Sequence, residues 1–241
     1  MADRARPEAS VVVATHNRRD RLAAMLESLR AQTLEPTRFE IVVVDDASSD
    51  ETPALLEREA QRPGPALRVT RQELSRGPAA ARNAGWRAAR GGLVAFIDDD
   101  CIAAAGWLEA GLAAHAQSPG AFVQGPVGPI PHEAERRGPF TRTVTVDSLG
   151  PYYQTCNIFY PRELLERLDG FDETFPNPGG EDTDLAWRAI EAGVEPVWAG
   201  DAAVHHAVNR FDLEGLVQLA LRWAPSMEVY LRHPKLREEV F

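Results

Sequence analysis

Short, mostly apolar runs alternate with segments of helical periodicity through the first hundred residues, and this alternation constrains the fold more than any other feature. Such runs are typical of strands that are buried on both faces of a sheet. Strands that alternate with helices favour a mostly parallel sheet with helices on both faces. The expected strands are 10–14, 39–44, 67–70 and 93–97, and a helix follows each of the first three.

The second half of the chain is less regular. A Pro- and Gly-rich segment with a charged middle, 125–151, is predicted to be a mobile or partner-contacting loop. The tail, 213–231, is amphipathic and interrupted at Pro225. We also expect helices at 107–116, 161–170 and 181–192 and strands at 122–124, 153–160, 194–198 and 202–206. No internal repeat separates these elements, so one domain with a helical tail is expected.

Composition narrows the class of protein. The chain has 241 residues, long enough for one large α/β domain, and its net charge of -10 argues against a basic nucleic-acid-binding surface. Two cysteines, Cys101 and Cys156, lack the spacing of a zinc site, and so sparse a pair favours a reducing compartment. No apolar run approaches the ~20 residues of a membrane span, and the N-terminus lacks a signal-peptide pattern. We therefore expect a cytoplasmic location.

Three consecutive aspartates, Asp98, Asp99 and Asp100, close the apolar run 93–97. Like charges this close repel one another, so the fold must place positive charge among them. A divalent cation such as Mg²⁺ or Mn²⁺ prefers carboxylate oxygens and would supply that charge. The alternative is a solvated acidic turn, in which Asp is simply a good loop residue.

Polar residues also follow the first two predicted strands, at 15–18 and 45–46. Ligands of parallel α/β sheets bind beyond the carboxyl ends of the strands. The three strand ends together therefore predict one binding site.

Six segments resemble, in their order and spacing, the family 2 glycosyltransferases: 11–18, 42–50, 77–85, 96–100, 170–188 and 204–206. These enzymes invert the anomeric centre as they transfer a sugar from a nucleotide-diphosphate donor. The resemblance implies an α/β chain with a GT-A type, Rossmann-like α/β/α sandwich, a mostly parallel central sheet and a helical C-terminal tail. It places a nucleotide-binding half at about 9–100 and an acceptor-binding half at about 101–210, which complete a GT-A domain of residues 1–210, with the tail at 211–241.

The resemblance implies that residues at the ends of the first two strands bind the nucleobase. Thr15 and His16 would frame the base, whereas the alternative is a surface turn with Asn17 as a helix N-cap. Asp46 matches an aspartate that accepts a hydrogen bond from a pyrimidine ring, which favours UDP- or dTDP-linked donors, although a helix-entry turn would also use it.

Further donor contacts are implied for Arg82, Asp98 and Asp99. Arg82 would neutralise donor charge, although an exposed helical arginine is the alternative. One of the two aspartates would hold the ribose.

The resemblance also implies a metal site. Asp100 would coordinate Mn²⁺ or Mg²⁺ beside the diphosphate, and one histidine of the pair His205-His206 would complete the shell. Residues alternate along a strand, so only one of the two should face the metal, and His205 is the first choice.

The acidic group at the start of the helix 181–192 resembles the catalytic motif of the family. Asp182 would be the general base that deprotonates the acceptor hydroxyl. Glu181 and Asp184 would orient the acceptor or pair with Arg188. The alternative is that these acids only stabilise the helix dipole.

The predicted protein is thus a metal-assisted glycosyltransferase with a saccharide, lipid-linked or small-molecule acceptor and no nucleic-acid partner. Peripheral contact with the inner face of the membrane stays open. The alternatives are a non-catalytic nucleotide-sugar-binding module and a sugar-phosphate nucleotidylyltransferase. The latter should have a glycine-rich loop after the first strand, and residues 14–18 contain no glycine.

Overall fold

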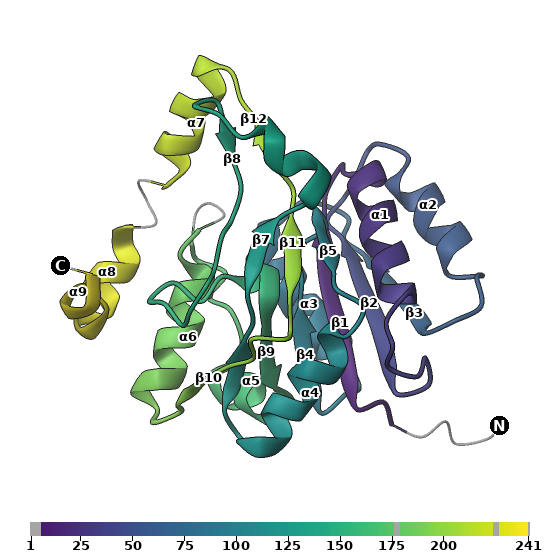
Figure 1. Cartoon of the computed structure of the whole chain (residues 1–241), viewed down its shortest axis with the longest axis horizontal. Helices are drawn as coiled ribbons and strands as arrows, with labels where there is room; N and C mark the ends of the chain where they lie inside the picture. The colour runs from purple at the N-terminus through teal and green to yellow at the C-terminus, as the bar shows by residue number, and fades with distance from the viewer. Residues whose placement is uncertain (1–5, 176–178, 224–226, 241) are drawn as a thin grey trace.

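The computed structural model describes residues 6–175, 179–223 and 227–240, and its centre is a seven-stranded sheet (Figure 1). The strand order is β10-β6-β9-β4-β1-β2-β3, and β9 alone runs antiparallel to its neighbours. The mostly parallel sheet expected from the sequence is therefore confirmed. Its strands are β1 (Ala9–Thr15), β2 (Phe39–Asp45), β3 (Ala66–Arg71), β4 (Leu93–Phe96), β6 (Phe122–Gln124), β9 (Ile158–Pro161) and β10 (Pro196–Trp198).

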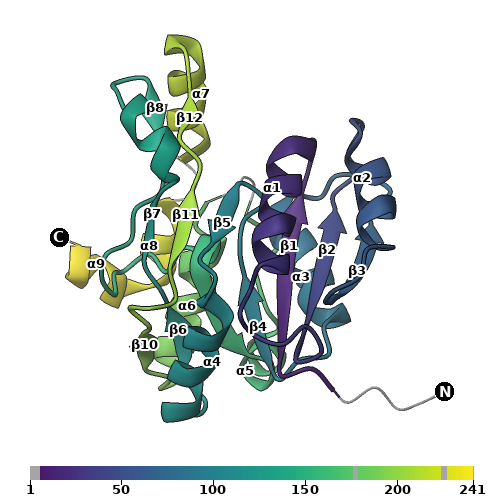
Figure 2. The same cartoon turned by 45° about the vertical axis from the view of Figure 1, so that its right-hand side comes forward.

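Helices cover both faces of this sheet because successive strand residues point to opposite sides. Val11 and Val13 of β1 pack with α1 (Arg19–Arg30), α2 (Thr52–Glu59) and α4 (Trp107–Gln117). Val12 packs on the other side with α3 (Gly77–Ala88), α5 (Arg162–Leu168) and α6 (Glu181–Glu191). Figure 2 shows α1 and α4 in front of the sheet. Both cores are apolar, so the continuous apolar runs of the sequence are explained by burial on two faces.

Short strands form two further sheets that the sequence did not predict in full. β5 (Cys101–Ala103), β11 (Val204–His206) and β7 (Val127–Pro129) make one, and β8 (Thr141–Arg142) pairs with β12 (Asn209–Arg210) in the other. The segment 125–151 is thus partly ordered into strands and a 3-10 helix, Pro131–Arg136. Both views show β8, β12 and α7 (Leu213–Trp223) together at the top of the molecule.

The strand expected at 153–160 is wrong in its first half. A 3-10 helix, Thr155–Asn157, precedes β9 because the buried Asn157 side chain is tied to three other segments. Its Nδ2 donates to the carbonyls of Pro126 and Ala202, and its Oδ1 accepts from the Trp107 indole. These contacts require a bend where an extended strand would carry the side chain away.

The C-terminal helices α8 (Glu228–Arg232) and α9 (Pro234–Val240) pack against α6. Val229 and Leu236 bury their side chains with Trp187. The break expected at Pro225 lies outside the described residues. In the described part of the chain, no helix is both long and apolar enough to cross a membrane.

Replacing Gly85 with Ala should loosen the contact between α3 and the sheet. A Cβ at this position would lie 2.4 Å from Cγ1 of Val12 and 3.3 Å from Cγ2 of Val44, so the helix must shift outward. We expect the free energy of unfolding in urea to fall by roughly 1–3 kcal/mol. Gly92→Ala is the control, because its nearest non-local atom would lie at 3.9 Å. Equal stability of the two variants would contradict this account of the packing.

Replacing His233 with Ala should destabilise the docking of α8 and α9 in a pH-dependent way. The ring contacts Asp184 at 3.1 Å and Glu191 at 3.0 Å, and although burial lowers the pKa of His233, these carboxylates raise it above 6.5 overall. A raised pKa stabilises the folded state below pH 6.5, and this contribution is lost as the pH rises through the folded-state pKa.

The cost of His233→Ala in urea unfolding should therefore be roughly 1–3 kcal/mol at pH 6 and smaller at pH 9. The exposed Lys235, changed to Ala, serves as the control. A cost that is the same at both pH values would show that the charge of His233 does not hold the tail.

Candidate active site

A cavity of about 1050 Å³ lies at the carboxyl ends of β1, β2 and β4. Its lining includes most of the side chains predicted to bind the donor and the metal: Thr15, His16, Asp46, Arg82, Asp98, Asp99 and Asp100. The strand ends identified in the sequence therefore converge on one site.

The acidic run after β4 is neutralised by two arginines. Arg18 donates to Asp99 at 3.3 Å and to Asp100 at 2.7 Å, and Arg82 donates to Asp98 at 2.9 Å. Burial nevertheless raises the pKa of Asp99 to about 7, against the attraction of Arg18. The positive charge that the sequence required is thus partly supplied by the protein itself, and Arg18 is a contact that sequence reasoning assigned no role.

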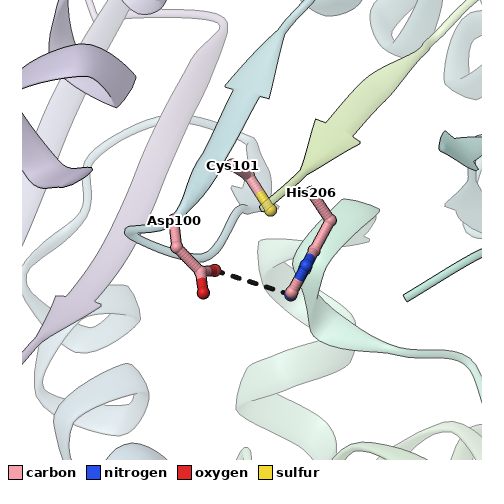
Figure 3. Close-up of side chains that lie close together, drawn as sticks. All are labelled: Asp100, Cys101 and His206. Carbon is pink, nitrogen blue, oxygen red and sulfur yellow. Dashed lines mark ion pairs between the residues drawn. The ribbon is translucent and has the colours of Figure 1, made fainter. Parts of the chain in front are cut away.

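Three potential metal ligands lie between β5 and β11: Asp100, Cys101 and His206 (Figure 3). The Nε2 atom of His206 is 3.5 Å from Oδ1 of Asp100. His205 is the alternate residue of the strand, and its Nδ1 is buried without a hydrogen-bond partner among the described residues. The structure therefore places His206, and not His205, beside Asp100, and the predicted role of metal ligand passes from His205 to His206.

Hydrogen bonds fix the orientation of the Asp100 and His206 side chains. Nδ1 of His206 lies 2.8 Å from the Ala207 carbonyl, which can only accept, so Nδ1 carries the proton in the neutral ring. Nε2 then presents a lone pair toward Oδ1 of Asp100. Oδ2 of Asp100 is taken by Arg18 and by Asn209 at 3.3 Å.

Hydrogen bonds join the loops that follow β1 and β2, which also line the cavity. The His16 ring donates from Nδ1 to the Asp46 carbonyl at 2.6 Å. Asn17 has a φ of 54° and accepts from the backbone of Ser49 and Asp50, so it does not cap α1 as the alternative reading proposed.

The Asp46 carboxylate joins β2 to the start of α3. It accepts from the Ser75 hydroxyl at 2.7 Å and from the backbone N–H groups of Arg76 at 2.8 Å and Gly77 at 3.0 Å. The carboxylate therefore organises the loop that precedes α3 while it also lines the cavity.

Arg82 links the acidic run to the first turn of α6. It is buried and donates to Asp98 and Glu181, each at 2.9 Å. Burial alone would lower the pKa of Arg82, but these carboxylates raise it above its usual value. Glu181 lines the cavity, so the structure connects the predicted donor and acceptor regions through one guanidinium.

The other two acids of this turn differ in position. Asp182 follows Glu181 in the chain, is half-buried and is not among the cavity-lining residues; burial, together with Glu181, raises its pKa to about 7. Asp184 is buried away from the lining, where it pairs with Arg188 at 2.8 Å and with His233. The pairing of Asp184 with Arg188 that the sequence left open is thus observed, and Asp184 does not belong to the cavity lining.

Several cavity-lining residues come from the half of the chain predicted to bind the acceptor or from the tail, where the sequence named no individual residue of them as a contact. Residues 142–145 belong to the segment 125–151, whose composition did suggest contact with a partner. The helix α7 lines the cavity with the residues on one of its sides. In the sequence, only its amphipathic pattern indicated that one side of this helix would contact another part of the protein. The remaining residues of this group are Gln154, Asn209, Phe211, Leu216, Leu219 and Ala220.

Comparison with known proteins identifies relatives over most of the chain. A family model described as glycosyl transferase family 2 matches residues 10–173, and one described as the N-terminal domain of galactosyltransferase matches residues 140–214. A validoxylamine A glucosyltransferase of Streptomyces hygroscopicus subsp. limoneus is 29% identical over 98% of this chain and 59% of its own length. The pre-mycofactocin glycosyltransferase of Mycobacterium tuberculosis is 28% identical over 94% of this chain and 48% of its own. The chain thus spans about half to three fifths of the length of these relatives.

Solved structures share the fold. A mannosyltransferase from Pyrobaculum calidifontis, in complex with GDP-Man and Mn²⁺, has a TM-score of 0.75 and 24% identity over 94% of this chain and 65% of its own. S. aureus TarS 1-349 in complex with UDP-GlcNAc has a TM-score of 0.70 and 24% identity over 85% of this chain and 60% of its own. These likenesses show the GT-A fold. Because the family model covers more than half of the chain, the protein belongs to glycosyl transferase family 2.

Proposed function

We propose that the chain transfers a sugar, with inversion, from a nucleotide-diphosphate donor to an acceptor hydroxyl with the assistance of a divalent cation. The observation that carries the proposal is the convergence of Asp46, Asp98–Asp100 and Glu181 on one cavity. Membership of the family supports it, as do the nucleotide sugars named for the two structural neighbours.

We assign the donor contacts to cavity carboxylates whose oxygens still have lone pairs without a partner in the protein. A carboxylate has about four lone-pair sites, and Asp46 uses three of them within the protein. The fourth can accept from a pyrimidine ring N–H, which favours a UDP- or dTDP-linked sugar. Both oxygens of Asp99 are engaged, by Thr15 and Arg18. Within the described ranges, Asp98 has one partnered side-chain oxygen, Oδ1, which accepts from Arg82, so we assign the ribose to Asp98.

The residues around Asp100 fit a divalent cation. Two lone pairs, on Oδ1 of Asp100 and Nε2 of His206, face one another at 3.5 Å and repel unless a cation or a proton lies between them. Asp100 and His206 would hold the cation, and imidazole ligation favours Mn²⁺ over Mg²⁺. When bound, it supplies Lewis-acid stabilisation of the charge on the departing diphosphate.

We assign the general base to Asp182. A carboxylate with a pKa near 7 can both remain ionised at neutral pH and accept a proton effectively in the transition state. Asp182 would take the proton of the acceptor hydroxyl while Arg82 holds the neighbouring Glu181 in place. Glu181 remains the proposed acceptor contact, because it lines the cavity, whereas the Asp184 carboxylate is occupied by Arg188 and His233.

The proposal also covers the acceptor side of the site and the location of the protein in the cell. Residues 101–210 would form the acceptor side, and the acceptor would be a saccharide, a lipid-linked molecule or a small molecule. Two free thiols, Cys101 and Cys156, suit a cytoplasmic location. Exposed leucine and valine side chains on the outer side of α7 suit peripheral contact with the inner face of the membrane: Leu213, Val217 and Leu221.

Replacing Asp182 with Asn should abolish most transfer while leaving donor binding intact. We expect the rate to fall by about a hundredfold or more, which is the usual contribution of a general base. Release of the nucleotide with donor and acceptor measures transfer, and calorimetry measures donor binding. The exposed Asp201, changed to Asn, is the control. Unchanged transfer would remove Asp182 from the role.

The pH profile tests the same assignment independently. Because the base acts when deprotonated, kcat/KM of the unmodified protein should rise with pH and level off above about 7. The residual activity of Asp182→Asn should lack this limb. A limb that persists unchanged in the variant would point to Asp99, whose pKa is also about 7.

A thermal-shift panel of UDP-, dTDP- and GDP-sugars with Mn²⁺, Mg²⁺ or EDTA tests the donor and the cation together. A donor at a hundred times its Kd stabilises the protein by about 2.7 kcal/mol. The shift should vanish with EDTA, in Asp100→Ala and in His206→Ala, and should persist in His205→Ala, the matched control. Donor binding that is unchanged by EDTA, by Asp100→Ala and by His206→Ala would refute the cation site. Binding without any nucleotide release would indicate a non-catalytic binding module.

A further inference from the structure

Cys101 has no role in the proposed transfer, yet its side chain lies close to both residues of the proposed cation site, Asp100 and His206. The residue opens β5 directly after Asp100 and is paired with His206 across the β5–β11 ladder. Its sulfur lies within 4.8 Å of a carboxylate oxygen of Asp100 and a ring nitrogen of His206 (Figure 3). All three side chains are buried, so the contact is internal to the fold.

The spacing of these atoms suits a tetrahedral ion. Zinc binds oxygen and nitrogen at about 2.0–2.2 Å and thiolate at about 2.3 Å, which places tetrahedral ligand atoms about 3.4–3.6 Å apart. Asp100 and His206 already have this separation, at 3.5 Å. The sulfur, within 4.8 Å of both, needs to approach by no more than about 1.3 Å.

The three donors also approach the site from complementary directions. Asp100 and His206 line the cavity, whereas Cys101 is absent from the lining and reaches the ion from the protein side. Three protein ligands therefore leave a fourth position that faces the cavity, as in zinc sites that bind an exchangeable ligand.

We propose that Cys101 is a third protein ligand of this cation site and that it makes the site prefer thiophilic divalent ions, zinc above all, over Mg²⁺. Thiolate ligands select soft ions, while Mg²⁺ prefers oxygen. On binding, the S–H bond breaks, a sulfur–metal bond forms and the proton passes to solvent. The inference rests on the cation site of the proposed function but does not require sugar transfer.

Cobalt absorption tests the ligand directly. The full chain, freed of metal with EDTA and exchanged into metal-free buffer, is titrated with CoCl₂ without any donor. The near-ultraviolet thiolate-to-cobalt charge-transfer band should appear in the unmodified protein and in Cys156→Ala, the matched control for the second buried cysteine. It should be missing in Cys101→Ala, in Cys101→Ser and in His206→Ala.

Competition with ZnCl₂ measures selectivity. Loss of the Cys101 thiol should weaken Zn²⁺ binding by at least about tenfold, since even partners outside the coordination shell are worth ~10–100-fold. The same variant should lose less affinity for Mn²⁺ than for Zn²⁺, because the oxygen and imidazole ligands remain.

The outcomes separate this inference from the proposed function. No thiolate band in a protein that binds donor with Mn²⁺ would overturn the role of Cys101 and leave the transfer proposal standing. A band that survives in Cys101→Ala and disappears in Cys156→Ala would also overturn it. A band that depends on Cys101 in a protein that binds no donor would support the ligand and count against the proposed function.

Discussion

The negative charge of the three aspartates after β4 constrains how the loops at the carboxyl ends of the strands are arranged. Two of the three carboxylates are buried, where an uncompensated charge would cost several kcal/mol. Arg18 reaches them from the loop after β1, and Arg82 reaches the third from α3. Thr15 and Asn209 add hydrogen bonds from β1 and β12. Elements far apart in the sequence are thus held at one edge of the sheet by the charges that they neutralise.

The site needs more than the parallel sheet. A parallel α/β sheet places loops at the carboxyl edge, but the second histidine of the pair reaches Asp100 only because β11 pairs with β5. The Asn157 side chain also ties the segments that lead into β7 and β11, because it donates to the carbonyls of Pro126 and Ala202, and these two strands pair with one another. The three-stranded sheet therefore positions His206 beside Asp100 at the carboxyl end of β4 in the seven-stranded sheet.

The sequence could predict what depends on local pattern. Apolar runs located β1, β2 and β4, and the polar residues after them located the cavity, because strand direction alone brings those ends together. It could not choose between His205 and His206, since the phase of the alternation depends on the pairing of two three-residue strands. It could not foresee the second partner of Asp184 either, because His233 lies 49 positions further along the chain. Contacts of this kind depend on tertiary packing rather than on propensity.

The first turn of α6 connects the cavity with the C-terminal helices. Glu181 and Asp184 are three residues apart, so they are neighbours on the surface of the helix. Glu181 is held by Arg82 at the cavity, and Asp184 is held by Arg188 and by His233 of the tail. Asp182 lies between them in the sequence, and its Oδ1 accepts from the backbone N–H of Thr183 at 2.9 Å. The helices α8 and α9 thus contact the helix that carries the proposed base, through His233 and Asp184 and through the packing of Val229 and Leu236 on Trp187, although they contribute none of the ligands proposed for the donor or the cation.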